Sequence, residues 1–270
     1  RAKHERGSFK FFDYSIDLEM QAKAALETEL RLAIPNGDIA PYFQPVVRLS
    51  DGDIAGYEVL ARWPHAVHGM ISPTRFIPVA EEAGLVDSLF WTLMARACRE
   101  ALRMGGDFPL SVNISPSQIR DQWFPEKVLR TLRETGFPPS RLEIEVTESA
   151  MFGDLERAKA ALQSLKNQGV RIALDDFGTG YSSLYLLRAL PIDKLKIDRS
   201  FVATLLTDKE TATIVGALVG LGRALGLLVT AEGVEDVATA EALASMGCQF
   251  AQGYLFGAAS EAPLYEHARR

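Results

Sequence analysis

Short runs rich in Val, Ile and Leu alternate with longer stretches of helical periodicity along most of this chain. An order of strand, helix and strand is typical of parallel strands joined by crossover helices. We expect eight strands, at Tyr42 to Leu49, Ile54 to Leu60, Leu110 to Ile114, Leu142 to Thr147, Arg171 to Asp175, Lys194 to Asp198, Leu227 to Ala231 and Gln249 to Tyr254.

The first two of these runs are separated only by Ser50 to Asp53, which is too short for a helical crossover. We therefore expect them to form an antiparallel hairpin, while the remaining strands are parallel. Eight strands with intervening helices predict a closed α/β barrel, irregular because of its antiparallel first strand.

Length and charge limit the classes of protein. A chain of 270 residues fits one barrel, preceded by an amphipathic helix from Ile16 to Ile34 that Pro35 to Gly37 should end. We expect residues 1–37 to be a helical linker and residues 38–270 to be the barrel domain. The net charge of −6 and the lack of a basic block argue against a DNA or RNA polymer as partner.

Cysteine usage and hydropathy favour a cytoplasmic domain. Cys98 and Cys248 are far apart in the sequence, which argues against a disulfide framework or a thiolate zinc site. The most apolar stretch, Ile214 to Val229, is interrupted by Arg223 and by glycines, so we expect a buried helix there. Because the sequence opens with Arg1, we expect it to be a piece of a longer protein, whose membrane anchor, if there is one, lies outside it.

Polar residues cluster where the expected strands end. Since the carboxyl ends of barrel strands meet at one rim, these side chains should converge there, where barrel enzymes carry their chemistry. The alternative is that each polar residue merely lies near water, and it weakens as the list lengthens. The residues are Glu58, Asn113, Glu145, Glu148, Asp175, Asp176, Lys196, Asp198, Glu232 and Gln252.

The run from Arg171 to Gly180 is the most specific local signal. Asp175 and Asp176 are adjacent at the end of a buried strand and would repel each other unless protonated or shared between cations; two divalent ions bridged by one Asp would relieve that repulsion. A dinucleotide-binding loop is the weaker alternative, because the third glycine of that motif is missing. A plain acidic turn is the other.

Strand alternation places charges on common faces. In Leu142 to Glu148, Glu143 and Glu145 share one face, so a cation should meet the Glu145 carboxylate if that face is interior. In Lys194 to Asp198, both lysines and Asp198 share a face; this is either an exposed pair or a lysine that orients a nucleophile. His65 and His68 lie in loop-like sequence, which favours exposure over metal binding.

With these residues identified, the chain resembles the EAL-domain family of cyclic-di-GMP phosphodiesterases from about Tyr42 to Phe256. The resemblance rests on ordered motifs, which are Phe43-Gln44-Pro45, Tyr57-Glu58-Val59-Leu60-Ala61-Arg62-Trp63, Phe76 to Glu82, Val112-Asn113-Ile114-Ser115, Glu145-Val146-Thr147-Glu148, Asp175 to Gly180, Lys196-Ile197-Asp198, Ala231 to Glu235 and Gln252-Gly253-Tyr254.

The resemblance implies a modified TIM (β/α)8 barrel that hydrolyses cyclic-di-GMP to linear pGpG with two Mg²⁺ or Mn²⁺ ions, by in-line attack of an activated water. It also implies a homodimer. By position, Glu58, Asn113, Glu145 and Asp175 would hold one metal, and Asp175, Asp176 and Glu232 the second.

The resemblance assigns further roles. Lys196, held by Asp198, would contact the attacking water, and Glu232 would be the general base. Gln44, Arg62 and Gln252 would contact substrate, and Glu148 would steady the loop from Asp176 to Tyr181. The lead-in Phe11-Phe12-Asp13 is similar to the connector that follows an upstream GGDEF-like domain, so we expect such a domain or a sensor in the native chain.

Three departures from the family pattern bear on affinity more than on catalysis. They are Val59 in the signature triplet, Pro64-His65-Ala66 after Trp63, and Gly257-Ala258-Ala259 near the end. A catalytically silent cyclic-di-GMP receptor is the main alternative function, although the complete set of ligand positions speaks against it. A two-carboxylate glycosidase is a third, from the fold alone.

Overall fold

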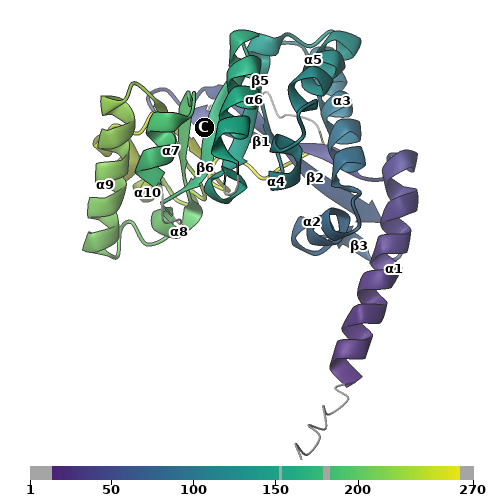
Figure 1. Ribbon diagram of the computed structural model, residues 1–270. Coiled ribbons are helices and arrows are strands. Elements are labelled where there is room, and N and C mark those ends of the chain that lie inside the picture. The colour runs from purple at the N-terminus through teal and green to yellow at the C-terminus, as the bar shows by residue number, and fades with distance from the viewer. Residues whose placement is uncertain (1–13, 152–153, 179–182, 262–270) are drawn as a thin grey trace, which may run out of the picture.

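The apolar runs form a closed barrel in a computed structural model that describes residues 14–151, 154–178 and 183–261 (Figure 1). The sheet order is β1-β9-β8-β7-β6-β5-β4-β2, and pairing of β1 with β2 closes it, while β3 extends β2. The strands are β1 (Ala40–Arg48), β2 (Ile54–His65), β3 (Gly69–Ile71), β4 (Leu110–Asn113), β5 (Leu142–Thr147), β6 (Arg171–Phe177), β7 (Lys194–Ile197), β8 (Leu228–Ala231) and β9 (Phe250–Gln252).

The expected antiparallel start is confirmed. Strand β1 runs antiparallel to both of its barrel neighbours, β2 and β9, whereas the pairs from β2–β4 round to β8–β9 are parallel. The turn between β1 and β2 is built from short polar residues, because the Asp51 carboxylate accepts the backbone N–H of Asp53 and Gly52 has a φ of 75°. This turn reverses the chain without a crossover helix.

Helices surround the barrel (Figure 1). Asp154, Asp208 and Asp236 cap three of them by accepting backbone N–H groups of the first turn. The helices are α1 (Tyr14–Asn36), α2 (Pro73–Glu82), α3 (Val86–Met104), α4 (Pro116–Ile119), α5 (Phe124–Thr135), α6 (Leu155–Asn167), α7 (Ser183–Ala189), α8 (Arg199–Val202), α9 (Lys209–Ala224) and α10 (Val237–Met246), with 3₁₀ turns η1 (Pro139–Arg141) and η2 (Glu148–Met151). No helix among these described residues is long and apolar enough to cross a membrane.

Strand β3 was not expected, and β2 extends beyond the expected end at Leu60. The two strands pair from Trp63 with Ile71 to His65 with Gly69. The connecting turn is held by the His65 ring, whose Nδ1 accepts the backbone N–H groups of Val67 and His68. A three-residue strand with one buried apolar residue has no periodicity to detect, so the sequence pattern could not reveal it.

The second half of α1 packs against the barrel through a separate hydrophobic cluster. Leu30 is fully buried there, together with Trp63 of β2 and Phe76 of α2. An ion pair between Lys23 and Glu82 also joins α1 to α2. Figure 1 shows the start of α1 projecting away from the barrel, and the apolar contacts of the helix come from its C-terminal half.

We predict that Leu30→Ala destabilises the fold by about 2–5 kcal/mol, because it leaves a cavity between α1 and the barrel. Leu32→Ala is the matched control, since Leu32 lies on the same helix but is 64% exposed, and its effect should stay within about 0.5 kcal/mol. Urea unfolding followed by circular dichroism measures both. Equal effects would contradict the packing of α1 described above.

Candidate active site at the carboxyl ends of the strands

Parallel pairing brings the polar strand ends to one end of the barrel. Asn113 of β4 is the register partner of Glu145 of β5, and Thr147 of β5 pairs with Asp175 of β6. On β7, Lys196 pairs with Thr230 of β8. These pairings place the inward side chains of neighbouring strands at similar heights, as the sequence predicted for the rim.

The Lys196 ammonium lies at the centre of the carboxylates. Its Nζ is 2.6 Å from Glu145 Oε2 and 2.5 Å from Glu232 Oε1. Asp175 Oδ1 follows at 3.5 Å and Glu58 Oε2 at 3.6 Å. The lysine side chain is only 2% exposed, so water screens these interactions little. The prediction that a cation meets Glu145 is confirmed.

One ammonium does not neutralise this cluster. Burial alone would lower the pKa of Lys196, but Glu145, Glu58, Glu232 and Asp175 outweigh it and raise that pKa well above its usual value. Burial raises the pKa of Glu145, and Glu58 and Asp175 add to the effect against the opposing charge of Lys196. Burial likewise raises the pKa of Glu232 to about 8. The single ammonium therefore supplies too little positive charge to compensate the carboxylates around it.

A chain of hydrogen bonds orders one side of the cluster. Asn113 Nδ2 donates to Glu58 Oε1 at 2.6 Å, which leaves the Asn113 carbonyl oxygen available as a ligand. Gln252 Nε2 donates to Glu58 Oε2 at 2.6 Å and to Gln44 Oε1 at 3.1 Å. The predicted substrate residues Gln44 and Gln252 thus adjoin the predicted metal ligand Glu58.

The Asp-Asp turn has a strained backbone held by a buried acid. Asp176 has a φ of 54°, the only positive value at a residue other than glycine in the described ranges, and its N–H donates to Asp175 Oδ1. Burial and the neighbouring Asp175 charge raise the pKa of Asp176. Glu148 Oε1 accepts the N–H of Gly178 at 3.0 Å, which fits its expected role at this loop. Thr179 to Tyr181 lie outside the described residues.

Two other predicted site residues, Asp198 and Arg62, are not bonded to the carboxylate cluster in the described residues. Asp198 caps α8 by accepting Ser200 N at 3.0 Å, and within the described chain it is not among the carboxylates paired with Lys196. The structure does not show the expected contact between Lys196 and Asp198 in its described residues, because β7 ends at Ile197 and the chain turns into α8. Arg62 donates to the Ala61 carbonyl and lines, with Asn113, a mainly apolar cavity of about 230 Å³.

The donor set suits a hard divalent cation. The converging groups are carboxylates and one amide, and oxygen ligands of this kind are preferred by Mg²⁺ and Mn²⁺. In the described residues no three acidic, imidazole or thiol groups are arranged around an ion position, because the carboxylates close on Lys196 instead. The residues therefore fit divalent ions in chemistry and charge, and binding requires the Lys196 ammonium to yield some of its contacts.

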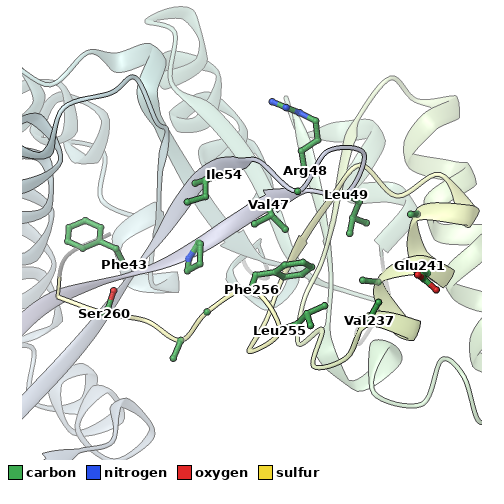
Figure 2. A pocket seen from close by; sticks show the side chains of 16 residues that line it. Phe43, Val47, Arg48, Leu49, Ile54, Val237, Glu241, Leu255, Phe256 and Ser260 are labelled. Atoms are coloured by element: carbon green, nitrogen blue, oxygen red, sulfur yellow. The ribbon is translucent and has the colours of Figure 1, made fainter. Parts of the chain in front are cut away.

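A larger cavity of about 380 Å³ lies away from this cluster (Figure 2). It is bounded by the hairpin of β1 and β2, by α10, and by the segment after β9, from which Leu255 and Phe256 point toward it. Among the residues that line it, Glu241 is the only carboxylate and none is a predicted site residue. Its walls therefore hold no cluster of carboxylates like the one around Lys196.

The strain at Asp176 gives a testable prediction. Asp176→Asn and Asp176→Ala both remove the charge, but Asn tolerates the left-handed conformation, so the Ala variant should be less stable by about 1 kcal/mol. Urea unfolding in EDTA measures the difference. The same two substitutions at Asp87 in α3 are the matched control. Because Ala is a better helix former than Asn, the Ala variant should be the more stable of the two there. The same order at both positions would contradict the assigned strain.

Comparison with known proteins agrees with the fold. The chain matches the EAL domain family over residues 27–259. An uncharacterized signaling protein of Caulobacter vibrioides is 43% identical over 258 residues, which cover 95% of this chain and 32% of that protein. The bifunctional diguanylate cyclase/cyclic di-GMP phosphodiesterase MucR of Pseudomonas aeruginosa is 39% identical over 257 residues, covering 93% and 37% respectively.

A solved structure of the PaMucR phosphodiesterase in complex with c-di-GMP superposes with a TM-score of 0.84 at 40% identity, over 88% of this chain and 98% of that one. The chain spans about a third of the length of the two full-length relatives. The family match includes both the barrel strands and the carboxylate cluster. The chain belongs to the EAL domain family.

Proposed function

We propose that this domain hydrolyses one phosphodiester bond of cyclic-di-GMP and releases linear pGpG. The observation that carries the proposal is the buried cluster in which Glu58, Glu145, Asp175 and Glu232 face a single ammonium. A diester phosphate is an anion, so such an acidic site can accept it only with additional cations. The similarity to MucR and to the c-di-GMP complex of PaMucR supports cyclic-di-GMP as that substrate.

Two sets of oxygen ligands would hold a pair of Mg²⁺ or Mn²⁺ ions. Glu58, Asn113, Glu145 and Asp175 form the first set, and Asp175, Asp176 and Glu232 the second. When bound, such ions polarise phosphoryl oxygens and lower the pKa of water. Asp175 belongs to both sets because it lies between the Lys196 cluster and the Asp176 turn.

The protein's own groups then position the water and move its proton. Lys196, freed from part of its carboxylate contacts, can donate a hydrogen bond that aligns the water with the phosphorus. We assign Glu232 as the general base, because its buried carboxylate lies 2.5 Å from the Lys196 ammonium that would hold the water. In-line attack forms the new P–O bond and breaks the ester bond opposite, leaving a 5′-phosphate on pGpG.

Substrate contacts come from the residues around Glu58. Gln44 and Gln252 offer amide groups next to that carboxylate, and the Arg62 guanidinium can pair with a phosphate oxygen. Asp198 acts through α8 at the edge of the site, since its charge contributes to the raised pKa of Asp176. We assign it a supporting role near the second ion set.

The surroundings of the domain are also proposals. We propose that the protein acts as a homodimer in the cytoplasm and that residues 1–37 link the barrel at 38–270 to an upstream GGDEF-like or sensor domain. The similarity to a bifunctional cyclase/phosphodiesterase, of which this chain covers 37%, supports such a domain. A membrane anchor elsewhere in the native chain stays a prediction.

Incubation with cyclic-di-GMP and Mn²⁺ or Mg²⁺, followed by chromatography, tests the function. We expect pGpG, no product in EDTA, and a loss of about 100-fold or more for Glu232→Gln, which removes the general base. Glu241→Gln is the matched control, because Glu241 is the carboxylate of the other cavity, and it should keep full activity.

Two outcomes would contradict the proposal in different ways. Tight binding of cyclic-di-GMP without product, at either metal, would identify a silent receptor. Product formation in EDTA, or an equal loss in Glu241→Gln, would show that the carboxylate cluster is not the catalytic site.

A further inference from the structure

A second buried ion pair lies below the Lys196 cluster, inside the barrel. Lys194 Nζ donates to Glu143 Oε1 at 2.7 Å, and Ser111 Oγ donates to the same oxygen at 2.7 Å. Glu143 is only 1% exposed. The Lys194 ammonium also lies 5.7 Å from the ring centroid of Phe250. The pair is thus enclosed by β4, β5, β7 and β9.

The two ion pairs form a ladder across β6. Strand β6 lies between β5 and β7, so each lysine of β7 must reach over it to a glutamate of β5. Lys194 meets Glu143, and two residues further along each strand Lys196 meets Glu145 at 2.6 Å. Ala173 is the register partner of both Lys194 and Glu145, and its methyl group leaves room for the lower pair.

The lower pair is neutral, whereas the upper cluster has excess negative charge. Burial would raise the pKa of Glu143, but the charge and hydrogen bond of Lys194, with Ser111, outweigh it and lower that pKa. The second oxygen, Glu143 Oε2, is buried and has no hydrogen-bond partner in the described residues. A buried carboxylate with a spare acceptor oxygen therefore lies two residues below Glu145.

A second lysine, Lys196, lies two residues from Lys194 on the same face of β7. Two residues along a strand span roughly 6.6 Å, which is close to the length of a lysine side chain. Without Lys194, the buried Glu143 carboxylate would keep only the Ser111 hydroxyl and the more distant charge of Arg171, and a buried charge without a close partner is strongly unfavourable. Arg171, the register partner of Glu143, is the other cation close by, and its Nη2 donates to Ser140 O at 3.4 Å.

We propose that Lys194 and Glu143 are positioning residues that keep Lys196 within the upper carboxylate cluster. Lys194 pairs with Glu143 and so prevents the Lys196 side chain from reorienting toward Glu143. This inference rests on the proposed function. It assigns a role to two residues that contact neither the substrate nor the proposed ions. The lower pair acts only through Lys196.

Mn²⁺ titration by calorimetry and turnover of cyclic-di-GMP test the proposal together, at a temperature where circular dichroism shows each variant folded. In Lys194→Met, Lys196 leaves the upper carboxylates, so Mn²⁺ should bind several-fold tighter while kcat falls by roughly 10- to 100-fold, the cost of a misplaced catalytic group. If the substitution only destabilised the barrel, Mn²⁺ affinity and kcat would fall together.

The double variant Glu143→Gln/Lys194→Met removes both charges and guards against misfolding. A buried pair replaced by neutral groups of similar volume is usually tolerated. We expect its Mn²⁺ affinity and kcat to return to within about threefold of the unaltered chain. Glu143→Gln alone leaves Lys194 free to compete for Glu145, so Mn²⁺ should bind several-fold more weakly. If Lys194→Met does not fold, these two variants decide.

Lys166→Met is the matched control, because it breaks another lysine–carboxylate pair, with Asp193 at 2.8 Å, outside the barrel interior. It should leave Mn²⁺ affinity and kcat unchanged. Unchanged values in a folded Lys194→Met, or a parallel loss of affinity and kcat, would overturn the proposal. An unaltered chain that binds Mn²⁺ but yields no pGpG would refute the proposed function alone, since the Mn²⁺ measurements still test the ladder.

Discussion

The Lys196 ammonium and the carboxylates around it determine how the rest of the structure is arranged. Four acidic side chains from β2, β5, β6 and the end of β8 can approach one another inside a barrel only because a cation lies between them. The hydrogen bonds of Asn113 and Gln252 to Glu58, and of Gly178 to Glu148, fix the flanking groups. The result is an ordered carboxylate cluster that one ammonium does not neutralise.

That shortage of charge links structure to function. A fully compensated cluster would be a structural ion pair, whereas this one keeps the pKa of Glu232 near 8 and that of Glu145 well above its usual value. Divalent ions would supply the missing positive charge and allow the carboxylate cluster to bind a phosphodiester. The closed lower pair of Glu143 and Lys194 differs in this respect, since its charges balance. The barrel interior thus contains a charge-balanced ion pair and, two residues further along the strands, a carboxylate cluster with excess negative charge.

Much of this arrangement could be predicted from the sequence, because strand alternation and strand ends follow simple geometry. The short Ser50 to Asp53 link predicted the antiparallel hairpin, and alternation in β5 predicted that Glu145 needs a cation. Contacts between distant strands could not be predicted, because they depend on how far each strand is shifted along its neighbours around the barrel. The choice of Glu145 rather than Asp198 as the partner of Lys196 is one example, and the Gln252 bond to Glu58 is another. Strand β3 was missed because three residues show no periodicity.

The most direct test of the account is anomalous diffraction from crystals grown with Mn²⁺. The account predicts anomalous peaks at the rim, bounded by Glu58, Glu145 and Asp175 on one side and by Asp176 and Glu232 on the other, with the Lys196 ammonium moved away from Glu145. Crystals in which the carboxylates remain closed on Lys196, and in which no peak is present at saturating Mn²⁺, would contradict it.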